Sequence, residues 1–473
     1  WDGNWFASKQ ITNPGNNNPG TDQQSLLNAS LPSWLKHHFS RYSFTTFNSG
    51  SATVRSIGNI LNDPNGTTNA TFGLRGAAMV KGQFTAGAFV WSIDSFLPCL
   101  MTRSDGSKYL NEKMIQAWDD AGMNGYVVML GVRCGVGSCS KSYLPIVYKT
   151  SNGGFSWTLL PPNDFTSATA LLNRLYPIKT NSTITIPFFS TNEGIDATVD
   201  INGQLHLACT VVGAYSLHND SLDYTHSFGP NQYSYSYGGG FEYPAIYDFY
   251  TNSVGGWNYH IVDSMGTEAP IGSFGTLANL WTDVAASKLD YNSRIQMSRN
   301  ASVSRIFYSW TESDTTISGP KWNLYPDIKM KGYDVTLYKL TSRLNVSSGI
   351  MNADKQSYFH FTSSKAISTG TTLCEIPLTI THNSTANCGT DVNHYYLKGT
   401  VFSSSDFTIN PNMSGGATSG CSALYIDEKI KKQIGIDFGS GYMTDPKTVE
   451  FLKNNFESYS EIFRKSWFPY KDL

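Results

Sequence analysis

Residues 144–160 read LPIVYKTSNGGFSWTLL, and this stretch decides the fold class because a polar turn separates two strand-like runs. The flanking runs LPIVYK and WTLL are rich in residues that favour strands. Between them, Asn152 can bond the amides of a turn, Gly154 can adopt a positive φ, and Trp157 can pack at a sheet edge. We therefore predict a β-hairpin at this position.

The same turn resembles the Asp-box, Ser/Thr-x-Asp/Asn-x-Gly-x-Ser/Thr-Trp, which is the signature of bacterial-neuraminidase repeats in sialidase-like β-propellers. The motif positions are occupied by Thr150, Asn152, Gly154, Ser156 and Trp157. The resemblance implies that residues 144–160 belong to a propeller blade. It implies little about activity, because Asp-boxes lie away from sialidase active sites and also occur in proteins that are not enzymes.

Strand-like runs continue on both sides of this hairpin, from about Phe44 to Ser348, with Gly, Asn, Asp and Pro turns between them. A β-sandwich rarely reaches this length, whereas a propeller grows by about 40–60 residues with each four-stranded blade. A weakly repeated pattern indicates five blades. We predict an all-β fold, a six- or seven-bladed β-propeller. The segments with this pattern are 78–92, 125–157, 196–212, 243–263 and 292–312.

Four regions are expected from the change in sequence character along the chain. They are an irregular N-terminal segment (1–45), the propeller body (46–348), a closing blade or appended β segment (349–425) and a helical C-terminal extension (426–473).

The C-terminal extension carries a strong helix signal. Asp445 and Pro446 suit the N-cap and the first helical position. Apolar residues then recur at helical spacing, which predicts an amphipathic helix. This helix packs on the propeller or docks a partner protein, and the sequence leaves both readings open. Its apolar positions are Val449, Leu452, Phe456, Tyr459 and Phe463.

Composition excludes several classes of partner. Of the 473 residues, 15% are charged and the net charge is -2, so we expect no nucleic-acid or anionic-lipid binding. No run of about 18 apolar residues occurs, so we expect no transmembrane helix. Because the chain starts at Trp1 rather than Met, we expect a processed or trimmed form.

Seven cysteines give a mild indication of an oxidising compartment. Cys134 with Cys139, and Cys374 with Cys388, each span a predicted loop, so each pair forms a local disulfide or stays as free thiols. The three remaining cysteines mean that at least one thiol is unpaired or bonded elsewhere. No Cys-x-x-Cys pattern or Cys/His quartet is present, so no metal or cofactor is expected. The remaining cysteines are Cys99, Cys209 and Cys421.

Several weaker patterns favour a structural reading over a chemical one. Asp200-Ile-Asn-Gly203 resembles the start of a calcium loop, but Asn-Gly between strands already signals a hairpin. The aromatic, glycine-rich stretch 233–243 lines a carbohydrate-binding surface or forms a loop. The neighbouring His37 and His38 lack nearby ligand partners.

Sialidase chemistry needs an arginine triad, a Tyr–Glu nucleophile pair and an acidic residue, and its first arginine usually stands in an Arg-Ile-Pro motif. Here Arg305-Ile306 is followed by Phe307 instead of Pro. Glu242 and Tyr243 are adjacent, so on a strand their side chains would point to opposite faces. We therefore assign no catalytic residue, and we lean against an enzyme.

Residues 319–349 resemble a blade of the large propeller proteins that Bacteroidota export through the type IX secretion system. This resemblance implies a protein on the outer cell surface. Those proteins commonly end in a β-sandwich sorting domain, whereas this chain is predicted to end in a helix. The matching residues are Pro326, Asp327, Ile328, Gly332, Tyr333, Asp334, Val335, Leu340 and Thr341.

Taken together, these patterns predict an extracellular or cell-surface propeller that is not catalytic and acts in protein–protein assembly or adhesion. The alternative is a carbohydrate-active enzyme, such as a sialidase-like glycoside hydrolase, or a glycan-binding lectin. Nine Asn-x-Ser/Thr sequons are compatible with an extracellular location. A protein partner is expected, and a glycan partner is the second candidate.

Overall fold

The computed structural model describes residues 5–8 and 23–26 and most of residues 35–411. Residues 412–473 lie outside the described part. Within 35–411, the longer undescribed stretches are 63–72, 173–185, 215–244, 266–293, 314–325, 348–357 and 383–392.

The described part is almost entirely β, and every strand pairing is antiparallel. Five sheets of four or five strands follow one another along the chain, and we call them sheets I to V. Sheet I contains β3 (Leu35–Asn48), β4 (Ser51–Asn62), β5 (Gly73–Thr85) and β6 (Ala88–Phe96). Sheet II contains β7 (Ile115–Trp118), β8 (Gly125–Gly131), β9 (Leu144–Thr150) and β10 (Thr158–Leu159).

Sheet III contains β11 (Ile186–Phe189), β12 (Ile195–Val199), β13 (Leu205–Ala214), β14 (Ala245–Thr251) and β15 (Trp257–Ser264). Sheet IV contains β16 (Gln296–Arg299), β17 (Arg305–Ser313), β18 (Pro326–Asp334), β19 (Lys339–Leu340) and β20 (Leu344–Asn345). Sheet V contains β21 (Tyr358–Thr362), β22 (Ile367–Thr369), β23 (Leu373–His382) and β24 (Asn393–Ser403). The other elements are the ribbon of β1 (Trp5–Ser8) and β2 (Gln23–Leu26), α1 (Thr169–Leu172) and the 3-10 turn Ser404–Asp406.

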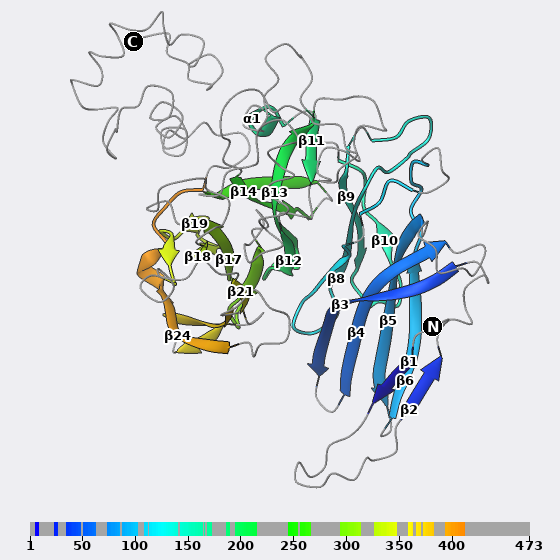
Figure 1. Cartoon of the computed structure of the whole chain (residues 1–473), viewed down its shortest axis with the longest axis horizontal. Coiled ribbons are helices and arrows are strands. Elements are labelled where there is room, and N and C mark those ends of the chain that lie inside the picture. The colour runs from blue at the N-terminus through cyan, green and yellow to red at the C-terminus, as the bar shows by residue number, and fades with distance from the viewer. Residues whose placement is uncertain are drawn as a thin grey trace, which may run out of the picture.

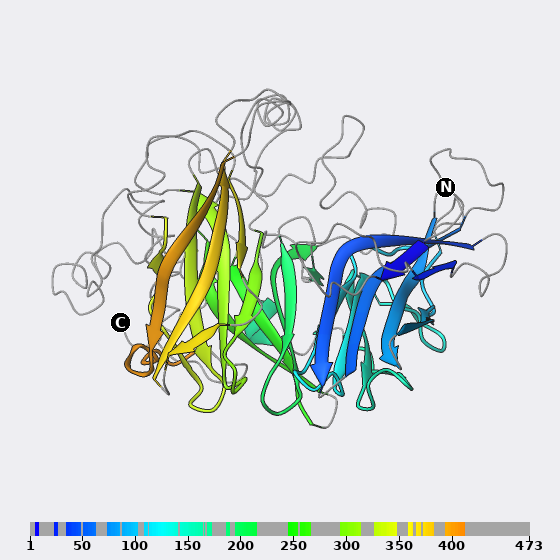
Figure 2. The ribbon, with the colours of Figure 1, turned by 90° about the horizontal axis from the view of Figure 1, so that it is seen from below.

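Each sheet packs face to face against the next one, because its strands carry apolar side chains on both faces. Met79 of sheet I and Met129 of sheet II share one buried cluster, and Val128 and Phe249 share the cluster between sheets II and III. Further clusters join sheet III to sheet IV and sheet IV to sheet V. The sheets follow each other around an arc, from β3–β6 to β21–β24 (Figures 1 and 2).

The arc has an inner side, which is formed by β3, β7, β12, β16 and β21, each at or near the start of its sheet. β7 contacts β3 and β12, and β16 contacts β12 and β21. Sheets that stack in chain order with their first strands gathered together are typical of the blades of a β-propeller.

Each inner strand has one edge that no strand of its own sheet pairs, so backbone groups on that edge would lack partners. Side chains from the neighbouring sheets bond to these groups. The Asp196 carboxylate accepts a bond from the Met297 amide at 2.8 Å, which joins β12 to β16. Lys113 Nζ donates to the carbonyl of Ile195 at 2.9 Å. Arg299 donates to the carbonyl of Val199 at 2.9 Å. The sheets are therefore held together at the inner side by side chain-to-backbone bonds.

The observed blade boundaries differ from those expected from the sequence. Residues 196–212 and 243–263, which were expected to be two blades, form one sheet, because β13 pairs with β14. The 30-residue connection 215–244 gives these strands a blade-like spacing in the sequence. Strand β3 also begins at Leu35, inside the segment that was expected to be irregular. The predicted C-terminal helix lies outside the described residues.

Candidate functional site

Hairpin turns from sheets II, III and IV gather on one side of the arc, at the ends of their strands, and we call this side the turn end. Turns 119–124, 200–204 and 300–305 join β7 to β8, β12 to β13 and β16 to β17, while turns 150–157 and 334–339 join β9 to β10 and β18 to β19. Backbone bonds tie neighbouring turns together, since the amide of Gly153 donates to Met123 at 2.9 Å. The amide of Ile201 likewise donates to the carbonyl of Val303 at 3.0 Å.

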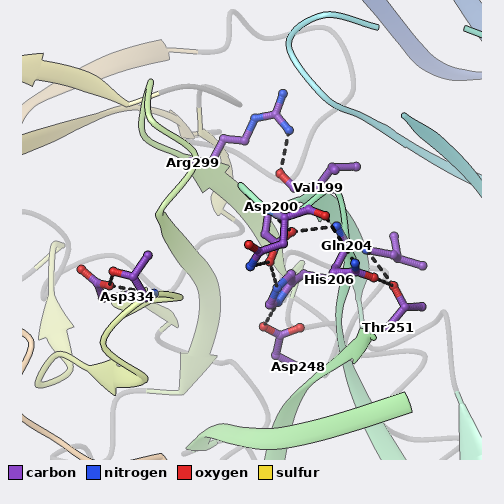
Figure 3. A network of polar contacts seen from close by, with 12 residues as sticks. Val199, Asp200, Gln204, His206, Asp248, Thr251, Arg299 and Asp334 are labelled. Carbon is purple, nitrogen blue, oxygen red and sulfur yellow. Dashed lines mark hydrogen bonds and ion pairs between the residues drawn. The ribbon is translucent and has the colours of Figure 1, made fainter. Parts of the chain in front are cut away.

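An Asp or Asn side chain shapes each of these turns by accepting bonds from backbone amides. Asp119 accepts from the amides of Met123 and Asn124 at 2.8 and 3.0 Å. Asp200 accepts from the amides of Asn202 and Gln204 at 2.9 and 2.7 Å. Figure 3 shows Asp200 beside Gln204 in this arrangement. These carboxylates are therefore committed to the turns.

The same device appears in sheet IV. Asn300 accepts from the amide of Arg305 at 2.9 Å, and Asp334 accepts from the amides of Thr336 and Leu337 at 3.0 and 2.9 Å. Asp334 also accepts from Arg305 Nε at 3.2 Å. Arg305, the arginine of the Arg305-Ile306 pair that lacks the sialidase Pro, is thus engaged at the turn end.

In the turn 150–157, the side chains of Thr150, Asn152 and Ser156 form hydrogen bonds within the turn, and Trp157 packs beneath it. Asn152 Oδ1 accepts from the amides of Phe155 and Ser156 at 3.1 and 3.0 Å, and its Nδ2 donates to Ser156 Oγ at 2.8 Å. The buried Thr150 hydroxyl accepts from the Gly154 amide at 3.0 Å. Gly154 has φ +84°, a value that suits glycine.

Trp157 anchors this turn to the sheets below it. Its ring packs edge to face on Trp118 and on Phe96, with centroids 5.6 and 5.0 Å apart. Arg55 lies 3.7 Å above the Trp118 ring and donates to the carbonyls of both neighbouring turns. Burial lowers the pKa of Arg55 to about 10, while Asp119 and Asp94 oppose that shift.

Two residues of the turn end carry backbone strain. Val303 has φ +57° and Tyr338 has φ +53°, and neither residue type favours this left-handed region. Such strain costs about 1–3 kcal/mol per residue and persists only where surrounding structure imposes it. The carbonyl of Val303 accepts the bond from the Ile201 amide, and Tyr338 lies within the turn that Asp334 shapes.

Large apolar side chains are exposed at the turn end. Phe155 is 78% exposed, and the others are between 45% and 58% exposed. The turn that carries Phe155 consists largely of Gly, Ser, Asn and Thr. Exposed aromatic and aliphatic groups that lie near one another are characteristic of interaction surfaces. The set comprises Met123, Phe155, Ile201, Leu337 and Tyr338.

A buried polar network lies beneath the turn end, between sheets III and IV. Figure 3 shows His206 directed at Asp248, and their Nδ1 and Oδ2 atoms are 2.7 Å apart. Tyr308 donates to the same Asp248 oxygen at 2.5 Å. His260 Nε2 lies 3.9 Å from this carboxylate, and Asp200 Oδ2 lies 3.6 Å from His206 Nε2. The network joins three strands of one sheet to β17 of the next.

The two histidines of this network have opposite protonation preferences. Burial disfavours the charge on His206, but Asp248 and Asp200 outweigh burial and raise its pKa to about 9. Burial lowers the pKa of His260 to about 4, with His206 and Lys331 adding repulsion against the attraction of Asp248. The network therefore holds one charged and one neutral histidine near neutral pH. Its complete burial assigns it to the packing of the sheets.

The sequence-based expectations for single residues have mixed outcomes. Asp200 closes a hairpin, and among the described residues no group of three or more His, Cys, Asp and Glu side chains is placed to hold a metal ion. Cys134 and Cys139 are joined by a disulfide. Cys374 has a buried free thiol, while Cys388 lies outside the described residues, so their pairing stays a prediction.

Other expectations fall outside the described residues. These are the stretch 233–243 with its Glu–Tyr pair and the docking helix with Val449, Leu452, Phe456, Tyr459 and Phe463. Within the described part, no helix is long and apolar enough to span a membrane. The strain at Val303 and Tyr338 was missed, because nothing in the residue types signals a positive φ.

No protein-family model matches the chain. Ribonuclease HII of Methanosarcina barkeri is 54% identical over 44 residues, and that of Picrophilus torridus is 49% identical over 49 residues. The matched parts cover 8% and 10% of this chain. The chain spans 20% and 24% of the length of these curated relatives, so their activity is not transferred to it.

Similar solved structures include Synechocystis apocarotenoid oxygenase, with a TM-score of 0.30 and 6% identity over 80% of this chain and 65% of that chain. The GH93 α-L-arabinofuranosidase of Fusarium graminearum has a TM-score of 0.29 and 12% identity over 75% and 79% of the two chains. Trypanosoma rangeli sialidase has a TM-score of 0.28 and 8% identity over 83% and 58%. Similarity at this level carries no argument about function, so the proposals below rest on the contacts of this chain.

Replacing Asn152 with alanine removes the acceptor of two turn amides. We expect Asn152→Ala to lower the free energy of unfolding by about 0.5–1.5 kcal/mol, since the two exposed amides exchange an intramolecular acceptor for water. Asn152→Asp keeps the acceptor oxygens and should retain most of the stability. Urea denaturation followed by tryptophan fluorescence measures the effect, with the exposed Ser151→Ala as control. Equal midpoints for Asn152→Ala and Ser151→Ala would show that the turn does not depend on this side chain.

The shifted pKa values of His206 and His260 predict that the free energy of unfolding is greatest near pH 6.5. Below the usual histidine pKa of about 6.5, the unfolded chain takes up a proton at His260 that the folded chain refuses until about pH 4, so stability falls. Above pH 6.5 the unfolded chain releases the His206 proton, which the folded chain keeps until about pH 9, so stability falls again. Each slope is at most about 1.4 kcal/mol per pH unit.

Denaturation midpoints measured from pH 4 to pH 9 check this dependence. His260→Gln should flatten the acidic limb, and His206→Gln should flatten the alkaline limb. If the curve of stability against pH keeps its acidic slope in His260→Gln and its alkaline slope in His206→Gln, other groups cause the pH dependence.

Proposed function

We propose that the chain is an extracellular β-propeller that acts as a protein–protein assembly or adhesion module, and that it binds its partner through the turn end. The observation that carries this proposal is the exposure of large apolar side chains on turns that are themselves rigid. Each of these side chains stands on, or next to, a turn that an Asp or Asn side chain shapes.

Rigidity matters because an interface loses less conformational entropy when its contact residues are ordered before binding. Phe155 illustrates this point. Its amide is bonded to Asn152, and the Lys81 ammonium lies 4.9 Å from the centre of its ring. An aromatic ring fixed in this way, surrounded by small polar residues, suits the centre of an interface.

The finer features of this proposal follow from the sequence and are compatible with the structure. The contacts of turn 150–157 suit an Asp-box, and the stacking of five described sheets suits a propeller of six or seven blades. The disulfide between Cys134 and Cys139 suits an extracellular location. Export by the type IX system of Bacteroidota and a second docking element at 445–463 remain predictions from the sequence.

The stretch that resembles the type IX propeller proteins contributes two aspartates to β18 of sheet IV. Asp327 accepts bonds from Ser347, Asn345 and Lys329, and Asp334 shapes its own turn. The two aspartates of this blade thus fix its strand connections.

The runner-up is glycan binding, which the exposed rings of Phe155 and Tyr338 favour, the first of them in a turn with Asn152 and Ser156. A protein partner is preferred because three of the five exposed side chains, Met123, Ile201 and Leu337, are aliphatic. Aliphatic groups gain from burial against apolar surface, which proteins supply more readily than sugars.

Binding of the labelled full chain to cells of its source organism tests the proposal. We expect the double variant Phe155→Ser with Ile201→Ser to reduce cell binding at least about tenfold, as loss of interface hot spots does. Leu97→Ser is the matched control, because Leu97 is 50% exposed at the opposite end of sheet I.

Treatment of the cells distinguishes the two kinds of partner. Loss of binding after mild protease treatment and its survival after periodate oxidation of glycans support a protein partner. The reverse result supports the glycan alternative. Binding that is equal for the wild type and the double variant would contradict a role for the turn end.

A further inference from the structure

Three cysteines lie side by side at the junction of sheets I and II. Leu100 and Arg133 form an antiparallel bridge, and the amide of Cys134 donates to the carbonyl of Cys99 at 2.9 Å. Cys99 is therefore directly opposite Cys134. On its other side, Cys134 forms an antiparallel bridge with Cys139. The middle cysteine thus has one cysteine opposite it on each side.

Residues directly opposite each other in an antiparallel pair project their side chains to the same face, with Cβ atoms about 4.5–5.5 Å apart. A disulfide requires Cα atoms within about 7 Å and Cβ atoms about 3.5–4.5 Å apart, so the Cβ atoms of Cys99 and Cys134 need to approach by only about 1 Å. Cys134 is accordingly placed to bond either neighbour. In this structure it is bonded to Cys139, and Cys99 carries a free, exposed thiol.

We propose that Cys99, Cys134 and Cys139 form a thiol–disulfide exchange site. The Cys99 thiol loses its proton to solvent, and the thiolate attacks Sγ of Cys134. A Cys99–Cys134 bond forms as the Cys134–Cys139 bond breaks, and the bonding electron pair leaves on Cys139, which takes up a proton from solvent. One disulfide and one thiol are present before and after, so no external oxidant or reductant is needed.

Access to the site is open from solvent. Cys99 is exposed, and Cys134 and Cys139 are half-buried. The loop 135–138 between the bonded cysteines is exposed throughout, and Val136 at its tip is fully exposed. The same thiol is therefore also available to small-molecule and peptide disulfides.

Exchange changes what the disulfide holds together. The Cys134–Cys139 bond spans 5 residues within one hairpin. The Cys99–Cys134 bond would span 134 − 99 = 35 residues and would tie the connection that follows β6 of sheet I to the strand that continues β8 of sheet II. Because a cross-link that closes a longer loop restricts the unfolded chain more, the exchanged form should resist unfolding better.

Peptide mapping of the full chain tests the proposal. The protein is equilibrated in a glutathione redox buffer, quenched with N-ethylmaleimide and digested with trypsin without reduction. Cleavage at Lys81, Arg103, Arg133 and Lys141 places Cys99 in peptide 82–103 and both other cysteines in peptide 134–141. We expect a fraction in which the two peptides are joined and Cys139 carries the label.

Two variants complete the test. Cys99→Ser should show no joined peptides and no label on Cys139. Cys139→Ser should form the joined peptides in nearly all molecules, which shows that Cys99 can reach Cys134. Wild-type protein that never yields joined peptides, and is labelled at Cys99 but not at Cys139, would overturn the proposal whatever the variants show.

Discussion

The inner edge of each sheet presents backbone donors and acceptors that no strand of the same sheet can pair. The rest of the architecture depends on how these groups are satisfied. Asp196 accepts from the first strand of the next sheet, while Lys113 and Arg299 donate to the backbone of β12 from its two neighbours. Such bonds fix both the spacing of the inner strands and their register. With the inner strands fixed, the wider faces of consecutive sheets can form the continuous apolar clusters that join sheets I to V.

At the turn end, side chains also satisfy backbone groups, but here they belong to the same turn. There, Asp and Asn side chains satisfy the amides of the turns, so the turns need no help from a neighbouring layer. Apolar side chains on these turns stay exposed, and strained residues such as Val303 are held in place. The turns of this surface are held by their own hydrogen bonds, and their apolar side chains remain exposed to solvent. This combination connects the folding of the turns to the proposed binding of a partner, whereas the buried His206–Asp248 network serves the contact between sheets III and IV.

Features that depend on contacts between residues close in the sequence could be predicted from it. The hairpin at 150–157, the all-β character and the turn at Asp200 follow from local residue types, since their contacts lie within a few positions. The assignment of β12–β15 to one sheet was not predicted, because a 30-residue connection separates β13 from β14. Nor could the inner-strand bonds be foreseen. Asp196 and Met297 are 101 residues apart, and the ion pair of Arg299 with Asp120 spans 179 residues, so only the stacking order of the sheets brings them together.

Hydrogen–deuterium exchange at the Met297 amide tests the central claim most directly, namely that side chains close the inner edges of the sheets. This amide lies on β16 and its acceptor is the Asp196 carboxylate. The account predicts slow exchange in the wild-type chain and exchange at least about tenfold faster in Asp196→Ala, corresponding to the loss of about 1.4 kcal/mol of protection. Amides within the β17–β18 ladder should be unaffected. Equal exchange at Met297 in both proteins would contradict the account.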